Sequence, residues 1–78
     1  MPDLVLYKKD SCPFCQKVLR FMASRGIELP MRDTALEPGA RDELVEKGGK
    51  GQVPCLFIDG RALYESDDII AWLGKNFA

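Results

Sequence analysis

Two of the three cysteines, Cys12 and Cys15, stand two residues apart in the segment CPFC. A pair with this spacing can bind a metal, form a structural disulfide or carry electrons by thiol–disulfide exchange. A structural disulfide would contribute little here, because closing so short a loop stabilises a chain by only ~2 kcal/mol, against ~3 kcal/mol for a loop of about 15 residues. The metal and redox interpretations then remain to be separated.

The other residue types in the chain argue against a metal at this pair. There are three cysteines and no histidine, so one chain offers neither a Cys/His zinc site nor four thiolates. The absence of histidine also excludes a cysteine–histidine nucleophilic pair. An odd number of cysteines is not typical of a secreted disulfide framework. We therefore expect no metal, and the redox interpretation is favoured.

Thiol–disulfide exchange requires a thiolate, so the surroundings of Cys12 must lower its pKa. Ionising a cysteine well below its ordinary range needs about 3.4 kcal/mol, of which a helix amino terminus supplies at most about 2 kcal/mol. Backbone N–H groups of Phe14 and Cys15 and a cation such as Lys9 must supply the rest. Cys15 falls one turn into the predicted helix and should be buried. This asymmetry assigns attack to Cys12 and resolution to Cys15.

The elements around this pair predict a βαβ unit. Residues 4–7 form an apolar run typical of a buried strand, and residues 8–11 form a polar loop in which Lys8 is interpreted as a solvated charge. Pro13 begins a helix that Gly26 ends. Residues 27–32 alternate between apolar and polar, which predicts a strand, and a proline within it places that strand at a sheet edge. A CxxC motif at the strand-to-helix turn of such a unit is a specific redox signal.

The second half predicts a helix, a hairpin and a final helix. The helix runs from Pro38 to Lys47 with positions 40, 44 and 45 turned inward, and residues 48–51 end it as a flexible loop. Residues 53–58 form a strand, Asp59-Gly60 a tight turn, and residues 61–64 the returning strand. Ser66 is the expected N-cap of the last helix, with acidic residues in its first turn and an apolar face at positions 69, 70, 73 and 77.

Length and composition limit the protein to one domain, residues 1–78. A chain with 46% hydrophobic and 29% charged residues is typical of a globular protein. The net charge of -1 gives no basis for binding nucleic acid or an anionic membrane. No apolar run is long enough to span a bilayer, and the amino terminus lacks the pattern of a signal peptide. We therefore expect a cytoplasmic protein, most simply a monomer.

With these motifs in place, the chain resembles the glutaredoxins of the thioredoxin-like superfamily. CPFC follows the first strand, and QVPCLFIDGRALYESDD resembles the family's second half. That second half is also similar to the amino-terminal domain of glutathione S-transferases. The resemblance implies an α/β fold, β-α-β-α-β-β-α, with a four-stranded mixed sheet of order 2-1-3-4, helices on both faces and a cis peptide at Val53-Pro54.

The resemblance also implies a glutathione groove. Cys12 matches the nucleophile and Cys15 the resolving cysteine. Lys9 matches a lysine near a carboxylate of glutathione, and the backbone of Val53 matches the one that pairs with the cysteinyl unit. The remaining matches are Ser66 and Asp67 for the γ-glutamyl end, Lys50 for a basic or amide side chain, and Phe14 and Pro54 beside the active cysteine.

Three positions depart from the family's pattern. Phe14 replaces a commoner tyrosine, so a role for that hydroxyl is absent. Tyr64-Glu65 replaces a Gly-Gly pair before the γ-glutamyl site and is more like a transferase. Cys55 is an extra thiol near the active site, and its apolar setting favours a structural role over a redox one.

The sequence therefore predicts a glutathione-dependent thiol–disulfide oxidoreductase that reduces glutathionylated proteins or other disulfides. One alternative is a [2Fe–2S] carrier in which Cys12 of two chains and two glutathiones are the ligands. Others are a redoxin recycled by thioredoxin reductase and a glutathione-binding module without turnover. The spacer Pro13-Phe14 and the presence of Cys15 favour the oxidoreductase.

Overall fold

Four strands form one mixed sheet in a computed structural model that describes residues 2–77. The strand order is β2-β1-β3-β4, with β1 parallel to β2 and the other neighbours antiparallel. This confirms the predicted thioredoxin-like fold and its element order. The elements are β1 (Leu4–Lys8), α1 (Pro13–Arg25), β2 (Met31–Asp33), α2 (Ala40–Gly48), β3 (Cys55–Ile58), β4 (Arg61–Leu63) and α3 (Ser66–Asn76).

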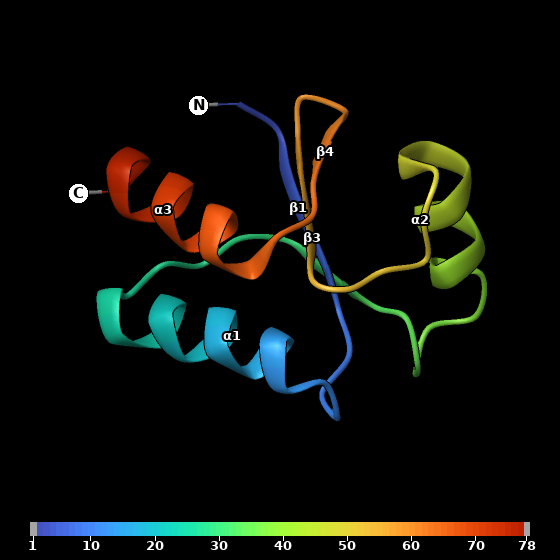
Figure 1. Ribbon diagram of the computed structural model, residues 1–78, viewed down its shortest axis with the longest axis horizontal. Helices are drawn as coiled ribbons and strands as arrows, with labels where there is room; N and C mark the ends of the chain where they lie inside the picture. Colours follow the sequence, from blue (N-terminus) through green and yellow to red (C-terminus); the bar gives the residue numbers. More distant parts are fainter. Residues whose placement is uncertain (1, 78) are drawn as a thin grey trace.

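The helices cover the two faces of the sheet unequally, with α1 and α3 on one side and α2 alone on the other (Figure 1). Because side chains alternate along a strand, β1 sends Leu4 and Leu6 to one face and Tyr7 to the other. The face under α1 and α3 holds an entirely apolar cluster, whereas the face under α2 holds a smaller one that includes a tyrosine and a cysteine. The first cluster comprises Leu4, Leu6, Val18, Met22, Ile27, Leu56, Ile69 and Leu73, and the second Tyr7, Leu44, Cys55 and Phe57.

Helix α1 begins and ends where the sequence predicts. Pro13 takes the first helical position, where its missing N–H costs no hydrogen bond. Gly26 adopts the left-handed conformation with φ of 66°, and the following N–H of Ile27 donates to the carbonyl of Met22 at 2.9 Å. These bonds satisfy carbonyls that the last turn leaves without partners. The helix is thereby fixed in register with Cys15 and Val18 facing the sheet.

The second strand was predicted too early in the chain. The edge position is confirmed, but β2 begins at Met31 rather than at residue 27. The alternation at residues 27–30 belongs to an extended connection in which Ile27 packs into the apolar cluster. Pro30 precedes the strand, and its carbonyl accepts a hydrogen bond from the N–H of Leu6 at 3.0 Å.

Helix α2 is shorter and exposes more than predicted. It begins at Ala40 rather than at Pro38, because Gly39 holds the left-handed conformation at the N-cap with φ of 83°. Ala40 and Leu44 are fully buried, as predicted, but the prediction for Val45 was wrong, since this side chain is 37% exposed. Residues four apart lie on one narrow stripe, and Val45 is turned about 100° away from Leu44.

The start of α3 also differs from the prediction. Glu65, not Ser66, is the N-cap, and among residues 2–77 no side chain hydrogen bonds to this helix start as a cap. Ser66 is instead the first helical residue, because β4 ends at Leu63 and leaves a two-residue connection. The preceding hairpin is confirmed, with positive φ at both Asp59 and Gly60. None of the helices in the described part of the chain is long and apolar enough to cross a bilayer.

Candidate active site

The loop between β1 and α1 places Cys12 at the N-cap of α1. Its backbone is extended, with φ of -88° and ψ of 121°, and its N–H donates to the carbonyl of Lys9 at 3.1 Å. The sequence offers no acidic residue in the first turn of α1. The unpaired N–H groups and the dipole of the helix therefore face the sulfur of Cys12 without an opposing carboxylate.

The surroundings of Cys12 favour its thiolate. Partial burial alone would raise the pKa of Cys12, but the N–H and the thiol of Cys15 oppose that effect. The N–H of Phe14 and the charge of Lys9 add to the opposition, so the pKa of Cys12 lies below its ordinary value. The thiol is half-buried and directed at the carbonyl of Val53, 3.8 Å away. The two N–H groups and the lysine charge are the donors and the cation that the sequence predicts for stabilising the thiolate.

Cys15 has the opposite character one turn later. It is fully buried, and its sulfur accepts a hydrogen bond from the N–H of Lys9 at 3.4 Å. Burial and the neighbouring Cys12 raise the pKa of Cys15 to about 11. All three cysteines lie within the described residues and are free thiols. A thiol with a lowered pKa thus stands beside one with a raised pKa, which is the asymmetry that attack and resolution require.

The loop that carries Cys12 is anchored by Lys8, whose interpretation as a solvated charge was wrong. Its side chain is only 16% exposed, and its ammonium lies 2.7 Å from Asp10 and 3.1 Å from Asp33. Asp33 is itself buried, and the N–H of Ala35 and the charge of Lys8 hold the pKa of Asp33 below its usual range. Lys8 and Asp33 are partners in the register of the parallel strands. Because both residues lie at the ends of adjacent strands, their ion pair could have been predicted from the sequence.

A groove of about 200 Å³ opens beside Cys12. Four of the predicted glutathione-binding residues line it: Phe14, Val53, Pro54 and Ser66. The peptide bond between Val53 and Pro54 is cis. Phe14 is 62% exposed, so its ring is available to a bound molecule rather than used in the core. Gln52, Tyr64 and Glu65 also line the groove.

The charged residues predicted for glutathione lie outside the lining of this groove. Lys9 acts on Cys12 through its charge. Lys50 lies with its ammonium 5.3 Å from the centre of the Tyr64 ring, which forms one wall. Asp67, in the first turn of α3, is 80% exposed and forms an ion pair with Lys17 of α1. Sequence reasoning missed that pair, because two exposed helix residues fifty positions apart carry no local signal.

Cys55 begins β3 on the opposite face of the sheet from α1. It is fully buried, it pairs in register with Tyr7, and burial raises its pKa to about 11. A neutral thiol of this kind packs as a small apolar side chain and reacts slowly. These properties support the structural role expected for Cys55.

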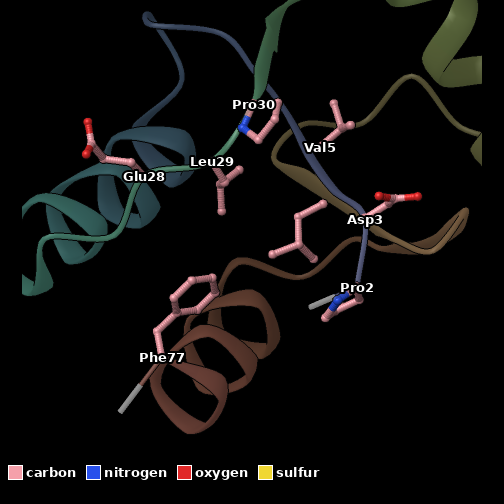
Figure 2. A pocket seen from close by; sticks show the side chains of 8 residues that line it. Pro2, Asp3, Val5, Glu28, Leu29, Pro30 and Phe77 are labelled. Carbon is pink, nitrogen blue, oxygen red and sulfur yellow. The ribbon is translucent and has the colours of Figure 1, made fainter.

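A second hollow, of about 550 Å³, lies at the other end of β1, between residues 2–5, residues 28–30 and Phe77. Figure 2 shows the carboxylates of Asp3 and Glu28 pointing away from the space between Leu29 and Phe77. No titratable group is thus aimed into this hollow among the residues that line it. Residues 2–77 also contain no cluster of three or more cysteine, aspartate or glutamate side chains placed to hold a metal ion.

Sequence comparison identifies the family of the chain. The profile of the glutaredoxin family matches residues 4–63, which include the active-site loop and the groove residues up to β4. The chain belongs to the glutaredoxin family. Accordingly, it is a thiol–disulfide oxidoreductase of the glutaredoxin type.

Individual glutaredoxins match over most of the chain. Glutaredoxin 3 of Escherichia coli K12 is 31% identical over 74 residues, covering 91% of this chain and 86% of the relative. Glutaredoxin-C4, chloroplastic, of Oryza sativa subsp. japonica is 32% identical over 73 residues, covering 87% of this chain and 53% of the relative.

Solved structures add the likeness to transferases. A delta-class glutathione transferase of Nilaparvata lugens superposes with a TM-score of 0.79 at 26% identity, covering 96% of this chain and 36% of the transferase. Glutathione transferase Omega 3C of Trametes versicolor superposes with a TM-score of 0.79 at 27% identity, covering 99% of this chain and 34% of the transferase. The chain thus spans about a third of each transferase, which confirms the expected likeness to one part of those enzymes.

Proposed function

We propose that this glutaredoxin reduces glutathionylated proteins and related disulfides with glutathione as its reductant, and that CPFC is its reactive dithiol. The observation that carries the proposal is the contrast within the motif. Cys12 is half-exposed at a helix start and has a lowered pKa, whereas Cys15 is fully buried and has a pKa of about 11. Cys12 therefore ionises more readily than Cys15 and is the sulfur that attacks.

The proposed reaction begins with the thiolate of Cys12. It attacks one sulfur of the substrate disulfide, the new S–S bond forms as the old one breaks, and the leaving thiolate takes up a proton. The mixed disulfide between Cys12 and glutathione is then resolved in one of two ways. A second glutathione thiolate attacks the glutathione sulfur, so that glutathione disulfide forms and the Cys12 thiolate leaves. Alternatively, Cys15 loses its proton and attacks the sulfur of Cys12, so that the glutathione thiolate leaves and a Cys12–Cys15 disulfide forms, which two further glutathione molecules reduce.

The groove beside Cys12 is the proposed binding site for the glutathione half of the substrate. The backbone of Val53 approaches the reactive sulfur, and Phe14, Pro54 and Ser66 line the same space. Lys9 supplies a cation that acts on Cys12, Lys50 supplies one beside the Tyr64 ring, and Asp67 supplies a carboxylate at the start of α3. Glutathione carries both carboxylates and an ammonium, so this mixed charge suits it.

A coupled assay with glutathione, glutathione reductase and a glutathionylated peptide tests the proposal. The wild type should turn over, Cys12→Ser should have no detectable activity, and Cys15→Ser should keep most deglutathionylation while losing reduction of dithiol-dependent protein disulfides. Turnover by Cys12→Ser with loss in Cys15→Ser would reverse the assigned roles. Reduction by NADPH and thioredoxin reductase alone, without glutathione, would instead support the redoxin recycled by that enzyme.

A further inference from the structure

Tyr64 stands at a position where the groove would otherwise have an open wall. It is the residue directly after β4, and it lines the groove together with Glu65. A glycine pair at these two positions would leave backbone there, whereas the Tyr64 ring reaches from the sheet to the end of α2. The contacts of this ring show what it holds in place.

The Tyr64 hydroxyl is bonded twice to the backbone of Lys50. It accepts a hydrogen bond from the N–H of Lys50 at 3.2 Å and donates one to the Lys50 carbonyl at 3.1 Å. The ammonium of the same lysine lies 5.3 Å from the centre of the ring, which is cation–π distance. Burial raises the pKa of Tyr64, so its hydroxyl remains a donor at neutral pH.

The segment that Tyr64 contacts has few side chains that could make stabilising contacts. Residues 48–51 are Gly-Gly-Lys-Gly, and Gly49 takes the left-handed conformation with φ of 88°. A methyl group at Gly48 would overlap the Tyr64 hydroxyl, so the helix end and the ring are in close approach. The guanidinium of Arg41 lies against Gly51 at the far end of the segment. Lys50 itself is therefore located mainly by Tyr64.

This segment leads directly into the reactive part of the site. Gln52 and Val53 follow it and line the groove, and the Val53 carbonyl faces the sulfur of Cys12 at 3.8 Å. A change in the position of Lys50 therefore moves a positive charge that lies against the Tyr64 ring, which is one wall of the groove, and it moves the chain that leads to Val53.

We propose that Tyr64 is a positioning residue which, by holding Lys50 beside the groove, gives the enzyme its preference for anionic disulfide substrates over uncharged ones. The inference rests on the proposed function, in which the thiolate of Cys12 attacks the glutathione sulfur and the peptide thiolate leaves and is protonated. Lys50 attracts a carboxylate of the incoming glutathione unit, and Tyr64 determines where that attraction acts.

Single-turnover kinetics with the reduced enzyme test this inference without a recycling system. One peptide is prepared as two mixed disulfides, with glutathione and with uncharged 2-mercaptoethanol, and release of the free peptide thiol is followed by quenching and mass spectrometry. Tyr64→Phe keeps the ring and removes the hydroxyl. It should lower the rate constant for the glutathione disulfide by about fivefold, the effect of losing roughly one net hydrogen bond. The rate constant for the mercaptoethanol disulfide should stay within about twofold of the wild-type value.

Two further variants make the result specific. Lys50→Met should lower the same rate constant by a similar factor, and the double variant should show less than the product of the two effects, because both act through one position. Tyr7→Phe is the matched control, since its hydroxyl bonds to Glu43 under α2 and not to the groove. It should leave the ratio of the two rate constants unchanged.

Equal losses for both disulfides in Tyr64→Phe, or multiplicative effects with Lys50→Met, would overturn the inference. If Tyr64→Phe folds poorly, Lys50→Met tests the inference by itself. An unchanged ratio of the rate constants for the two disulfides in Lys50→Met would also overturn the inference. A wild-type enzyme that releases no thiol from either peptide would overturn the proposed function itself, and the inference with it.

Discussion

Helices α1 and α3 lie on the same face of the sheet (Figure 1) and pack together. Both begin beside the groove, yet their first turns differ in charge. The first turn of α1 has no acidic residue, and Lys9 precedes it. The first turn of α3 contains Asp67 and Asp68, with Glu65 at the N-cap. Within residues 2–77, neither helix has a side-chain cap.

This difference shows how one structural device serves two purposes. At α1 the free N–H groups and the dipole are left to stabilise an anion that the chemistry creates, namely the thiolate of Cys12. At α3 the helix is already complemented by its own carboxylates, so its start presents negative charge to the groove. A substrate with a cation at one end and a carboxylate at the other can be oriented between these two helix starts. Each of the following predictions changes one side of this contrast.

Removing the anchor of the α1 start should have the largest effect. Lys8→Met deprives the buried carboxylate of Asp33 of its cation and releases Asp10, so the melting temperature should fall by several degrees and the loop should loosen. Because the N–H groups around Cys12 are then less well placed, its pKa should rise, which alkylation rates measured against pH would detect. Lys47→Met, an exposed lysine on α2, is the control. An unchanged melting temperature in Lys8→Met would show that the loop does not depend on this pair.

The buried thiol of Cys55 provides a reference outside both helix starts. Its pKa is raised from 9.0 to about 11, so as the pH rises from about 9 the unfolded chain ionises first and folding loses stability until about pH 11. The free energy of unfolding should therefore fall by about 2 kcal/mol less in Cys55→Ala than in the wild type between about pH 8 and about pH 10.5.

Urea unfolding at the two pH values measures this difference, and the neutral Cys15 contributes equally to both proteins. The same fall in the variant as in the wild type would mean that Cys55 is not held neutral in the fold. Oxidoreductase activity at neutral pH should be retained in Cys55→Ala. A Cys12–Cys55 disulfide as a major species after mild oxidation, seen by mass spectrometry, would contradict the structural role.

Much of this contrast was predictable from the sequence, because it depends on local signals. The start of α1 follows from Pro13 and from the apolar face that continues through Val18, and its stop follows from Gly26. The four-stranded order followed from the family resemblance that CPFC and the second half of the chain carry. Those features are set by neighbours in the sequence or by a long motif.

The remainder depends on contacts that only the folded chain creates. The pair formed by Lys8 and Asp33 arises from the register of two parallel strands, of which β2 has only three residues and no pattern of its own. The prediction that Val45 is buried was wrong because the sequence of a two-turn helix does not determine the width of its apolar face. Tyr64 departs from the family's glycine, and its role becomes visible only where its ring meets the backbone of Lys50.

A negative charge placed in the first turn of α1 should reduce the difference in charge between the starts of α1 and α3. Gln16→Glu puts a carboxylate near the N–H groups that serve Cys12, so the pKa of Cys12 should rise. Its alkylation at about pH 6 should then slow by about threefold to fivefold, the size of a helix-dipole interaction. Gln16→Met is the matched control, because both variants lose the side-chain donor to the Asp10 carbonyl, 2.7 Å away. Equal rates in the two variants would show that the added charge is not sensed.

The smallest expected effect concerns the ion pair between Lys17 and Asp67, which joins the two helices at their exposed surface. The side chains are 48% and 80% exposed, so the pair should contribute little to stability. It does, however, occupy the carboxylate that we propose for the γ-glutamyl end of glutathione. Asp67→Asn should therefore raise KM for a glutathionylated peptide by about threefold, which is a typical size for an exposed charged contact.

Lys17→Met should act in the opposite direction. With its competing ammonium removed, Asp67 is free to bind the substrate, and KM should fall by about twofold, while kcat stays unchanged because neither residue contacts the reacting sulfurs. In the double variant the effect of Lys17→Met should vanish, since the carboxylate it releases is no longer present. Steady-state kinetics of the three variants under one ionic strength measure these signs. If Lys17→Met raised KM instead, Lys17 would itself contact the substrate, and the start of α3 would not be the negative end of the groove.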